Sequence, residues 1–250
     1  MNSTKIYYKK DVKFKAPVMI VGLPGIGSVG SLVAEYLRNE LGAKRFATLY
    51  SPHFIHQTIM LKSGYTRLIS NRFYSKDTKK GTVIILLGDT QAASPEGQYE
   101  INEKIVKFFK KLGGKTIYTI GGYSAGGHYV HNPKVYGVAT DKQTKTTLSK
   151  KGVIFGQTNG AIWGSAGMIV TFAKKHKIHA ACIMGETGAL EIDANSARAV
   201  LETVKSVLGI NINLENIDKI KKETDRMIKE IEESQKLQEA PHKENFPYIR

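Results

Sequence analysis

Glycines spaced as G-x-G-x-x-G, in Gly25-Ile-Gly-Ser-Val-Gly30, separate an apolar run from a segment with helical periodicity. Such glycines can let amides at a helix start hold a dinucleotide pyrophosphate. That site also needs an acidic residue roughly 20 positions on, after the next strand. Here that strand ends Thr48-Leu-Tyr-Ser-Pro-His53 without a carboxylate, and Pro24 alters the turn. We therefore expect no nucleotide cofactor, and glycines that bring the helix close to the sheet.

A second motif, Gly122-Tyr-Ser-Ala-Gly126, matches the G-x-S-x-G turn that presents the nucleophilic serine of many hydrolases. That turn must lead directly into a helix, whereas the residues up to Pro133 are poor helix formers. A triad would also need an acid and then a histidine later in the chain, and no later histidine follows a strand with a convincing acid before it. These features disfavour Ser124 as a nucleophile.

Histidines occur in three pairs spaced by three residues, but carboxylates and thiolates that would complete a metal site are missing around them. We expect no metal cofactor. The only cysteine, Cys182, lies in an apolar run and is interpreted as a packed thiol. The pairs are His53 with His56, His128 with His131, and His176 with His179.

Carboxylates follow two predicted strands, at Asp89 and Glu186, where the loops of an α/β sheet form a cleft. They could serve an enzyme acting on a nucleoside or small ester, which would use the loops around Gly25, Asp89, Ser124 and Glu186. The structural alternative is that both carboxylates cap amides of the adjacent loops. The sequence leaves this choice open.

Apolar runs and helical stripes alternate along the chain, which predicts an α/β fold with a mostly parallel or mixed sheet and helices on both faces. Asp193 or Ser196 is expected to cap a helix that ends at Leu208. The segment Gly160 to Lys174 is predicted to be a helix buried nearly all round. Predicted strands cover the apolar run that begins at Val18 and residues 45–50, 55–61, 64–74, 82–87, 115–120, 135–140 and 179–184, with an edge strand in 4–15 and helices over 29–37 and 95–112.

The 250-residue chain carries a formal net charge of +15, and residues 1–213 account for +16 of it with 29 basic and 13 acidic side chains. Most of these cations are lysines scattered in ones and twos, which disfavours specific nucleic-acid binding and is compatible with an acidic protein partner. No apolar run approaches the roughly 20 residues that cross a bilayer. A cytoplasmic protein without a membrane partner is expected.

After residue 213 the composition changes, so we predict an α/β domain over 1–213, an amphipathic helix over 214–239 and a flexible tail over 240–250. Apolar residues of the helix form a narrow seam that should lie against a partner helix or the domain. The seam residues are Ile217, Ile220, Thr224, Met227 and Ile231. The tail ends in the apolar sequence Phe246-Pro247-Tyr248-Ile249-Arg250, typical of a peptide that docks elsewhere.

Several phrases together resemble the proteasome-assembly-chaperone-2 family, in particular its archaeal homologues, over about residues 15 to 210. The resemblance implies a three-layer α/β domain, similar in outline to nucleoside-phosphorylase-like folds, that has no enzymatic activity. The phrases are Gly22-Leu-Pro-Gly-Ile-Gly-Ser-Val-Gly30, Gly88-Asp-Thr-Gln91 with Gly97-Gln-Tyr99, Ile120-Gly-Gly-Tyr123, Asn159-Gly-Ala-Ile-Trp-Gly-Ser-Ala-Gly167 and Gly185-Glu-Thr-Gly188.

The same resemblance implies a homo-oligomer that binds proteasome α subunits and assists proteasome assembly, and it allows a paralogous chaperone as a further partner. Family members that dock on the α-ring end in a hydrophobic residue, a penultimate Tyr and any last residue. In this chain Tyr248 is third from the end, so the pattern departs from the family's by one position. The residues expected to bind the partner are Phe246, Pro247, Tyr248, Ile249 and Arg250.

Overall fold

The computed structural model describes residues 3–9, 12–127, 129–156, 160–188 and 191–239, and gives no side-chain positions for 228 and 230–239. Nine strands form one mixed sheet in the order β1-β3-β6-β7-β2-β8-β11-β9-β10. The middle four run parallel, with Val18 opposite both Val83 and Thr116. They are β7 (Gly81–Gly88), β2 (Val18–Gly22), β8 (Thr116–Ser124) and β11 (His179–Thr187).

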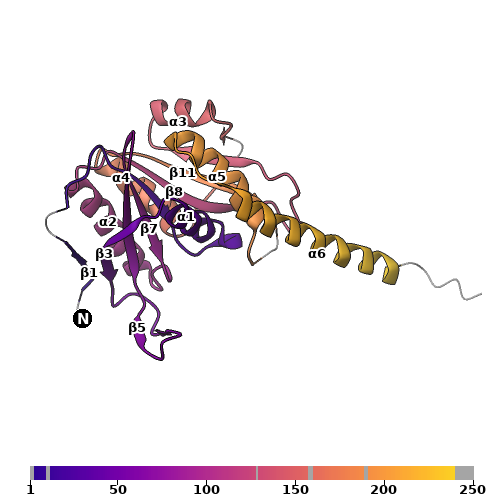
Figure 1. Cartoon of the computed structure of the whole chain (residues 1–250). Coiled ribbons are helices and arrows are strands. Elements are labelled where there is room, and N and C mark those ends of the chain that lie inside the picture. Colours follow the sequence, from indigo (N-terminus) through magenta and orange to yellow (C-terminus); the bar gives the residue numbers. More distant parts are fainter. Residues whose placement is uncertain (1–2, 10–11, 128, 157–159, 189–190, 240–250) are drawn as a thin grey trace, which may run out of the picture.

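Shorter strands extend the sheet on both sides. On one side of the four parallel strands, β6, β3 and β1 follow in antiparallel pairs, and β1 is the predicted edge strand. On the other side, β9 pairs antiparallel with β11. A separate hairpin, β4 (Thr58–Met60) with β5 (Thr66–Leu68), projects from the body (Figure 1). The flanking strands are β1 (Lys5–Tyr8), β3 (Lys44–Tyr50), β6 (Asn71–Thr78), β9 (Val135–Ala139) and β10 (Ile154–Phe155).

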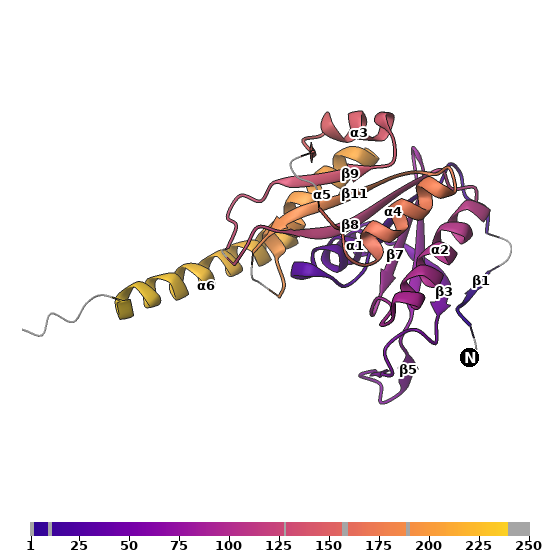
Figure 2. The same cartoon turned by 180° about the vertical axis from the view of Figure 1, so that it is seen from behind.

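Helices cover both faces of the sheet, which confirms the predicted α/β layering. Figure 2 shows α2 and α4 in front of the sheet and α1 and α5 behind it. Successive residues of β2 serve opposite layers: Met19 packs toward α2 and α4, and Ile20 toward α1 and α5. The helices are α1 (Val29–Glu40), α2 (Pro95–Lys111), α3 (Lys142–Ser149), α4 (Ser165–Lys175), α5 (Ala194–Leu208) and α6 (Glu215–Glu239).

Local capping explains where two helices begin. Asp193, one of the two predicted candidates, caps α5 by accepting a hydrogen bond from the amide of Ser196 at 2.8 Å. The helix expected from Gly160 instead begins at Ser165, because Gly164 has a φ of +76° that breaks the helical path. The expectation that this helix is buried nearly all round is wrong, since Thr171 and Lys174 are exposed.

Lysines that are scattered in the sequence gather in the fold at the edge of the sheet where the four parallel strands begin. Their spacing in the sequence therefore did not indicate that they share one surface. Helices α2 and α4 run antiparallel to these strands, so their last turns lie at the same edge. The lysines of these last turns complement the negative ends of the helix dipoles. Lys110 there donates to the carbonyl of His176 at 3.1 Å. Exposed cations of this edge, hereafter the lysine edge, include Lys15, Lys44, Arg45, Lys80, Lys110, Lys111, Lys115, Lys174, Lys175 and Lys177.

The last helix, α6, leaves the body after its first turns and extends away from it in both views (Figures 1 and 2). Among the described residues, no helix is both long and apolar enough to cross a membrane.

Candidate functional site

The glycine-rich turn after β2 packs α1 tightly against the sheet, as predicted. A β-carbon on Gly30 would lie 2.7 Å from the carbonyl oxygen of Ile120 on β8. Gly27 has a φ of +62°, and a β-carbon there would lie 2.6 Å from the hydroxyl of Thr187. The carbonyl of Gly27 also accepts a hydrogen bond from the amide of Asp193. These contacts explain why glycine, which has no β-carbon, occupies both positions.

Asp89, one of the two strand-end carboxylates, is enclosed by cations. Its Oδ1 lies 2.9 Å from Arg67 and 2.8 Å from Arg72, and its Oδ2 accepts the amide of Ser70 at 3.0 Å. Burial by itself raises the pKa of Asp89, but hydrogen bonds from Arg67 and Ser70 and the charge of Arg72 outweigh it and lower the pKa. The carboxylate therefore ties the β4–β5 hairpin to the end of β7.

Glu186 and Ser124 lie at the carboxyl ends of neighbouring strands, yet they are not joined into a catalytic set among the described residues. Glu186 accepts the amide of Lys134 at 3.0 Å and the hydroxyl of Tyr136 at 3.4 Å, which matches the capping alternative. Ser124 is exposed, and the described residues after it, to Tyr136, form no helix. The serine is thus placed without the helix that a nucleophile elbow requires.

Three of the described histidines pair individually with acidic side chains. His53 bonds Glu100 at 3.0 Å, His176 bonds Glu103 at 3.3 Å and His179 bonds Asp141 at 3.0 Å. His131 packs edge-on against Tyr129, while His128 lies outside the described residues. Within the described part of the chain, no group of three potential ligands could hold a metal ion.

The buried Cys182 thiol matches its predicted packing role. Burial raises the pKa of this thiol to about 11, so little thiolate exists at neutral pH.

A cavity of about 570 Å³ opens at the carboxyl ends of β2, β8 and β11. Its wall combines residues from separate glycine-rich phrases of the sequence, including Gly25, Gly121 and Gly164. Of the twenty described residues that line it, none carries a formal charge and most are apolar or glycine. The further lining residues are Val21, Leu23, Ile26, Gly30, Gln91, Ile120, Gly122, Tyr123, Ser124, Val138, Gly160, Ala161, Ile162, Trp163, Ser165, Ala166 and Met184.

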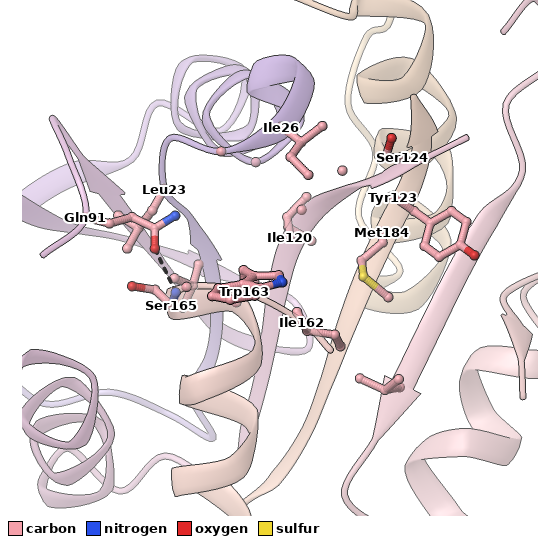
Figure 3. Close-up of a pocket in the computed structure, with 18 of the residues that line it drawn as sticks. Leu23, Ile26, Gln91, Ile120, Tyr123, Ser124, Ile162, Trp163, Ser165 and Met184 are labelled. Atoms are coloured by element: carbon pink, nitrogen blue, oxygen red, sulfur yellow. Dashed lines mark hydrogen bonds between the residues drawn. The ribbon is translucent and has the colours of Figure 1, made fainter. Parts of the chain in front are cut away.

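Gln91 braces one wall of this cavity. Its amide nitrogen donates to the carbonyl of Pro24 at 2.6 Å, and its Oε1 accepts the amide of Ser165 at 2.7 Å, the bond drawn in Figure 3. The side chain thereby joins the glycine-rich turn to the start of α4. In the sequence Gln91 stands out only as part of the phrase Gly88-Asp-Thr-Gln91, because its two hydrogen-bond partners are 67 and 74 residues away in the chain.

Of the apolar seam residues of α6 whose side chains are described, one is covered and two are uncovered. Ile217 is 1% exposed in the core, whereas Ile220 is 45% and Met227 is 63% exposed. Ion pairing holds the first turn, since Arg198 of α5 lies 2.7 Å from Asp218. The side chain of Ile231 and residues 246–250 lie outside the described part of the chain.

This chain is similar to a known protein over nearly its whole length. The profile described as the PAC2 family matches residues 19–232. The Methanocaldococcus jannaschii protein MJ1210 is 36% identical over 247 residues, which cover 96% of this chain and 95% of that protein.

Two solved structures from Pyrococcus furiosus share the fold. PbaB, described as an archaeal proteasome activator, aligns with a TM-score of 0.86 and 33% identity over 93% of this chain and 100% of its own. PbaA, described as an archaeal homolog of proteasome-assembly chaperone, aligns with a TM-score of 0.76 and 24% identity over 95% of this chain and 97% of its own.

Proposed function

Because the chain belongs to the PAC2 family, we propose that it is a non-enzymatic chaperone that forms homo-oligomers, binds proteasome α subunits and assists proteasome assembly. The descriptions of PbaB and PbaA, a proteasome activator and a chaperone homolog, support a proteasome-related role. In this proposal the protein acts in the cytoplasm, and a paralogous chaperone is a further partner.

The observation that carries the proposal is the geometry of α6. The helix is anchored by Ile217 and then leaves the body, so Ile220 and Met227 are uncovered in the single chain. These residues recur at steps of three and seven, which places them on one side of the helix. An apolar side on a projecting helix is suited to a second helix or to a partner protein.

The tail completes this arrangement as the proposed anchor. Residues 246–250 follow α6 in the sequence, and the proposal assigns the anchoring role to this apolar end. In this proposal Tyr248 supplies an aromatic ring for a groove between α subunits.

A pull-down with purified α subunits tests the tail. The full chain should recover α subunits, and a form ending at Ala240 should recover far fewer. Equal recovery by both forms would exclude the tail as the anchor.

Substitutions in the seam test the role of α6 separately. Ile220→Lys and Met227→Lys should reduce self-association or α-subunit recovery, because each places a charge on the apolar side. Asn216→Lys is the matched control, since it adds the same charge at an exposed polar position of the same helix. If all three variants behave alike, the seam has no role beyond solubility.

A further inference from the structure

The cavity at the ends of β2, β8 and β11 has no part in the proposed action of α6 and the tail. Nevertheless, segments far apart in the sequence converge on it: the turn at Gly25, the loop at Gln91, the end of β8 and the residues that precede α4. It lies outside the carboxyl ends of parallel strands, the usual ligand position in α/β sheets. Its volume of about 570 Å³ is in the range of small-molecule sites.

The chemistry of the wall restricts the ligand. The described residues that line it include no Lys, Arg, His, Asp or Glu, although the chain as a whole carries 37 Lys and Arg residues. A phosphate or carboxylate would lose its hydration there without gaining a cation. Such a site favours neutral ligands.

Trp163 gives the cavity an aromatic surface. The residue lies just before α4, lines the cavity and is 89% exposed, so its ring is not used in the core. In Figure 3 it extends between Gln91 on one side and Met184 on the other. An exposed indole can stack with a flat ligand and donate one hydrogen bond from its ring nitrogen. The hydroxyl of Ser124 supplies a second polar group at the rim.

From these observations we propose that the cavity binds a neutral aromatic or heteroaromatic small molecule, which stacks on Trp163. The apolar floor of Val21, Ile120 and Met184 buries the ring, while Trp163 and Ser124 orient its polar atoms.

The test uses the full chain and the fluorescence of Trp163, which is the only tryptophan in the sequence. The probes are two matched pairs, benzamide with benzoate and adenosine with adenosine monophosphate. At least one neutral probe should change the emission saturably, and its anionic counterpart should bind at least about tenfold more weakly. The absence of a saturable change with both neutral probes, or equal binding of the anions, would overturn the proposal.

Two variants locate the binding. A β-carbon on Gly121 would lie 3.8 Å from both Ala166 and Met184, so Gly121→Leu directs a larger side chain into the cavity and should abolish binding. Gly127→Leu is the control, because a β-carbon at Gly127 meets nothing within 4 Å. Saturable binding that persists in a folded Gly121→Leu protein would contradict the assignment.

A third variant covers the case in which Gly121→Leu fails to fold. Trp163→Leu changes an exposed ring, and saturation-transfer NMR of whichever neutral probe binds the full chain should then lose its signal. A retained signal contradicts stacking on Trp163. If neither neutral probe binds the full chain but α subunits protect Trp163 from acrylamide quenching, the cavity belongs to a protein interface and the small-molecule proposal is wrong.

Discussion

Gly22 at the end of β2 faces Gly30 of α1 so closely that a β-carbon on Gly22 would lie 2.0 Å from the carbonyl oxygen of Gly30. The same atom would lie 2.4 Å from the β-carbon of Ala34. Backbone meets backbone here, and a side chain could be accommodated only if the helix moved. The turn that resembles a cofactor loop is therefore a close contact between a strand and a helix.

This contact predicts that Gly22→Ala lowers the free energy of unfolding by about 1–3 kcal/mol or more. The reason is the clash with the backbone of α1. Gly127→Ala, where a β-carbon meets open space, should change it by less than about 1 kcal/mol. Urea unfolding curves of the two variants give the comparison, and similar midpoints would show that α1 is not held by this contact.

Asp89 should contribute stability at neutral pH that is lost in acid. Its pKa is lowered in the folded protein, so its contribution is present above the unfolded pKa of about 3.9 and disappears as pH falls through the folded value. Asp89→Asn should cost about 1.5–3 kcal/mol near neutral pH and flatten the acid limb of the stability curve. Glu191→Gln, at an exposed position, is the control. Parallel acid limbs for Asp89→Asn and the unchanged protein would contradict this account.

Cys182 should resist thiol reagents in the folded state, because its side chain is fully buried and its pKa is raised to about 11. Labelling with Ellman's reagent should be very slow in buffer and complete in denaturant. Rapid labelling of the native protein would mean that the sheet around β11 opens readily.

The lysine edge should dominate binding to polyanions such as heparin. Replacing Lys110, Lys111, Lys174 and Lys175 by Gln should lower the salt concentration of elution. The control replaces Lys62, Lys134, Lys219 and Lys222, which removes equal charge elsewhere on the surface. If both sets elute together, net charge alone governs the binding.

Much of the fold could be predicted from the sequence because its signals are local. The apolar run of β7 predicted a strand covered on both faces, and Asp193 predicted the start of α5. The start of α4 was misplaced because Gly164 adopts a positive φ beside Gln91, a contact 73 residues apart in sequence.

The features of the candidate site depended on tertiary arrangement. The polar helix α3 was not predicted, and the lysine edge emerged only when strand starts and helix ends met. The cavity around Trp163 likewise joins segments that no spacing rule connects. The local sequences around Ser124 and Asp89 matched catalytic patterns. In the fold, however, the carboxylate of Asp89 accepts hydrogen bonds from Arg67 and Arg72.

The central claim, that α6 and the tail hold proteasome α subunits, is tested most directly by the native mass of mixtures with purified α subunits. Light scattering after size exclusion should show an oligomer of the full chain alone and a heavier complex with α subunits. The form ending at Ala240 should leave the α subunits at their own mass. An unchanged mass for the full chain with α subunits would contradict the account.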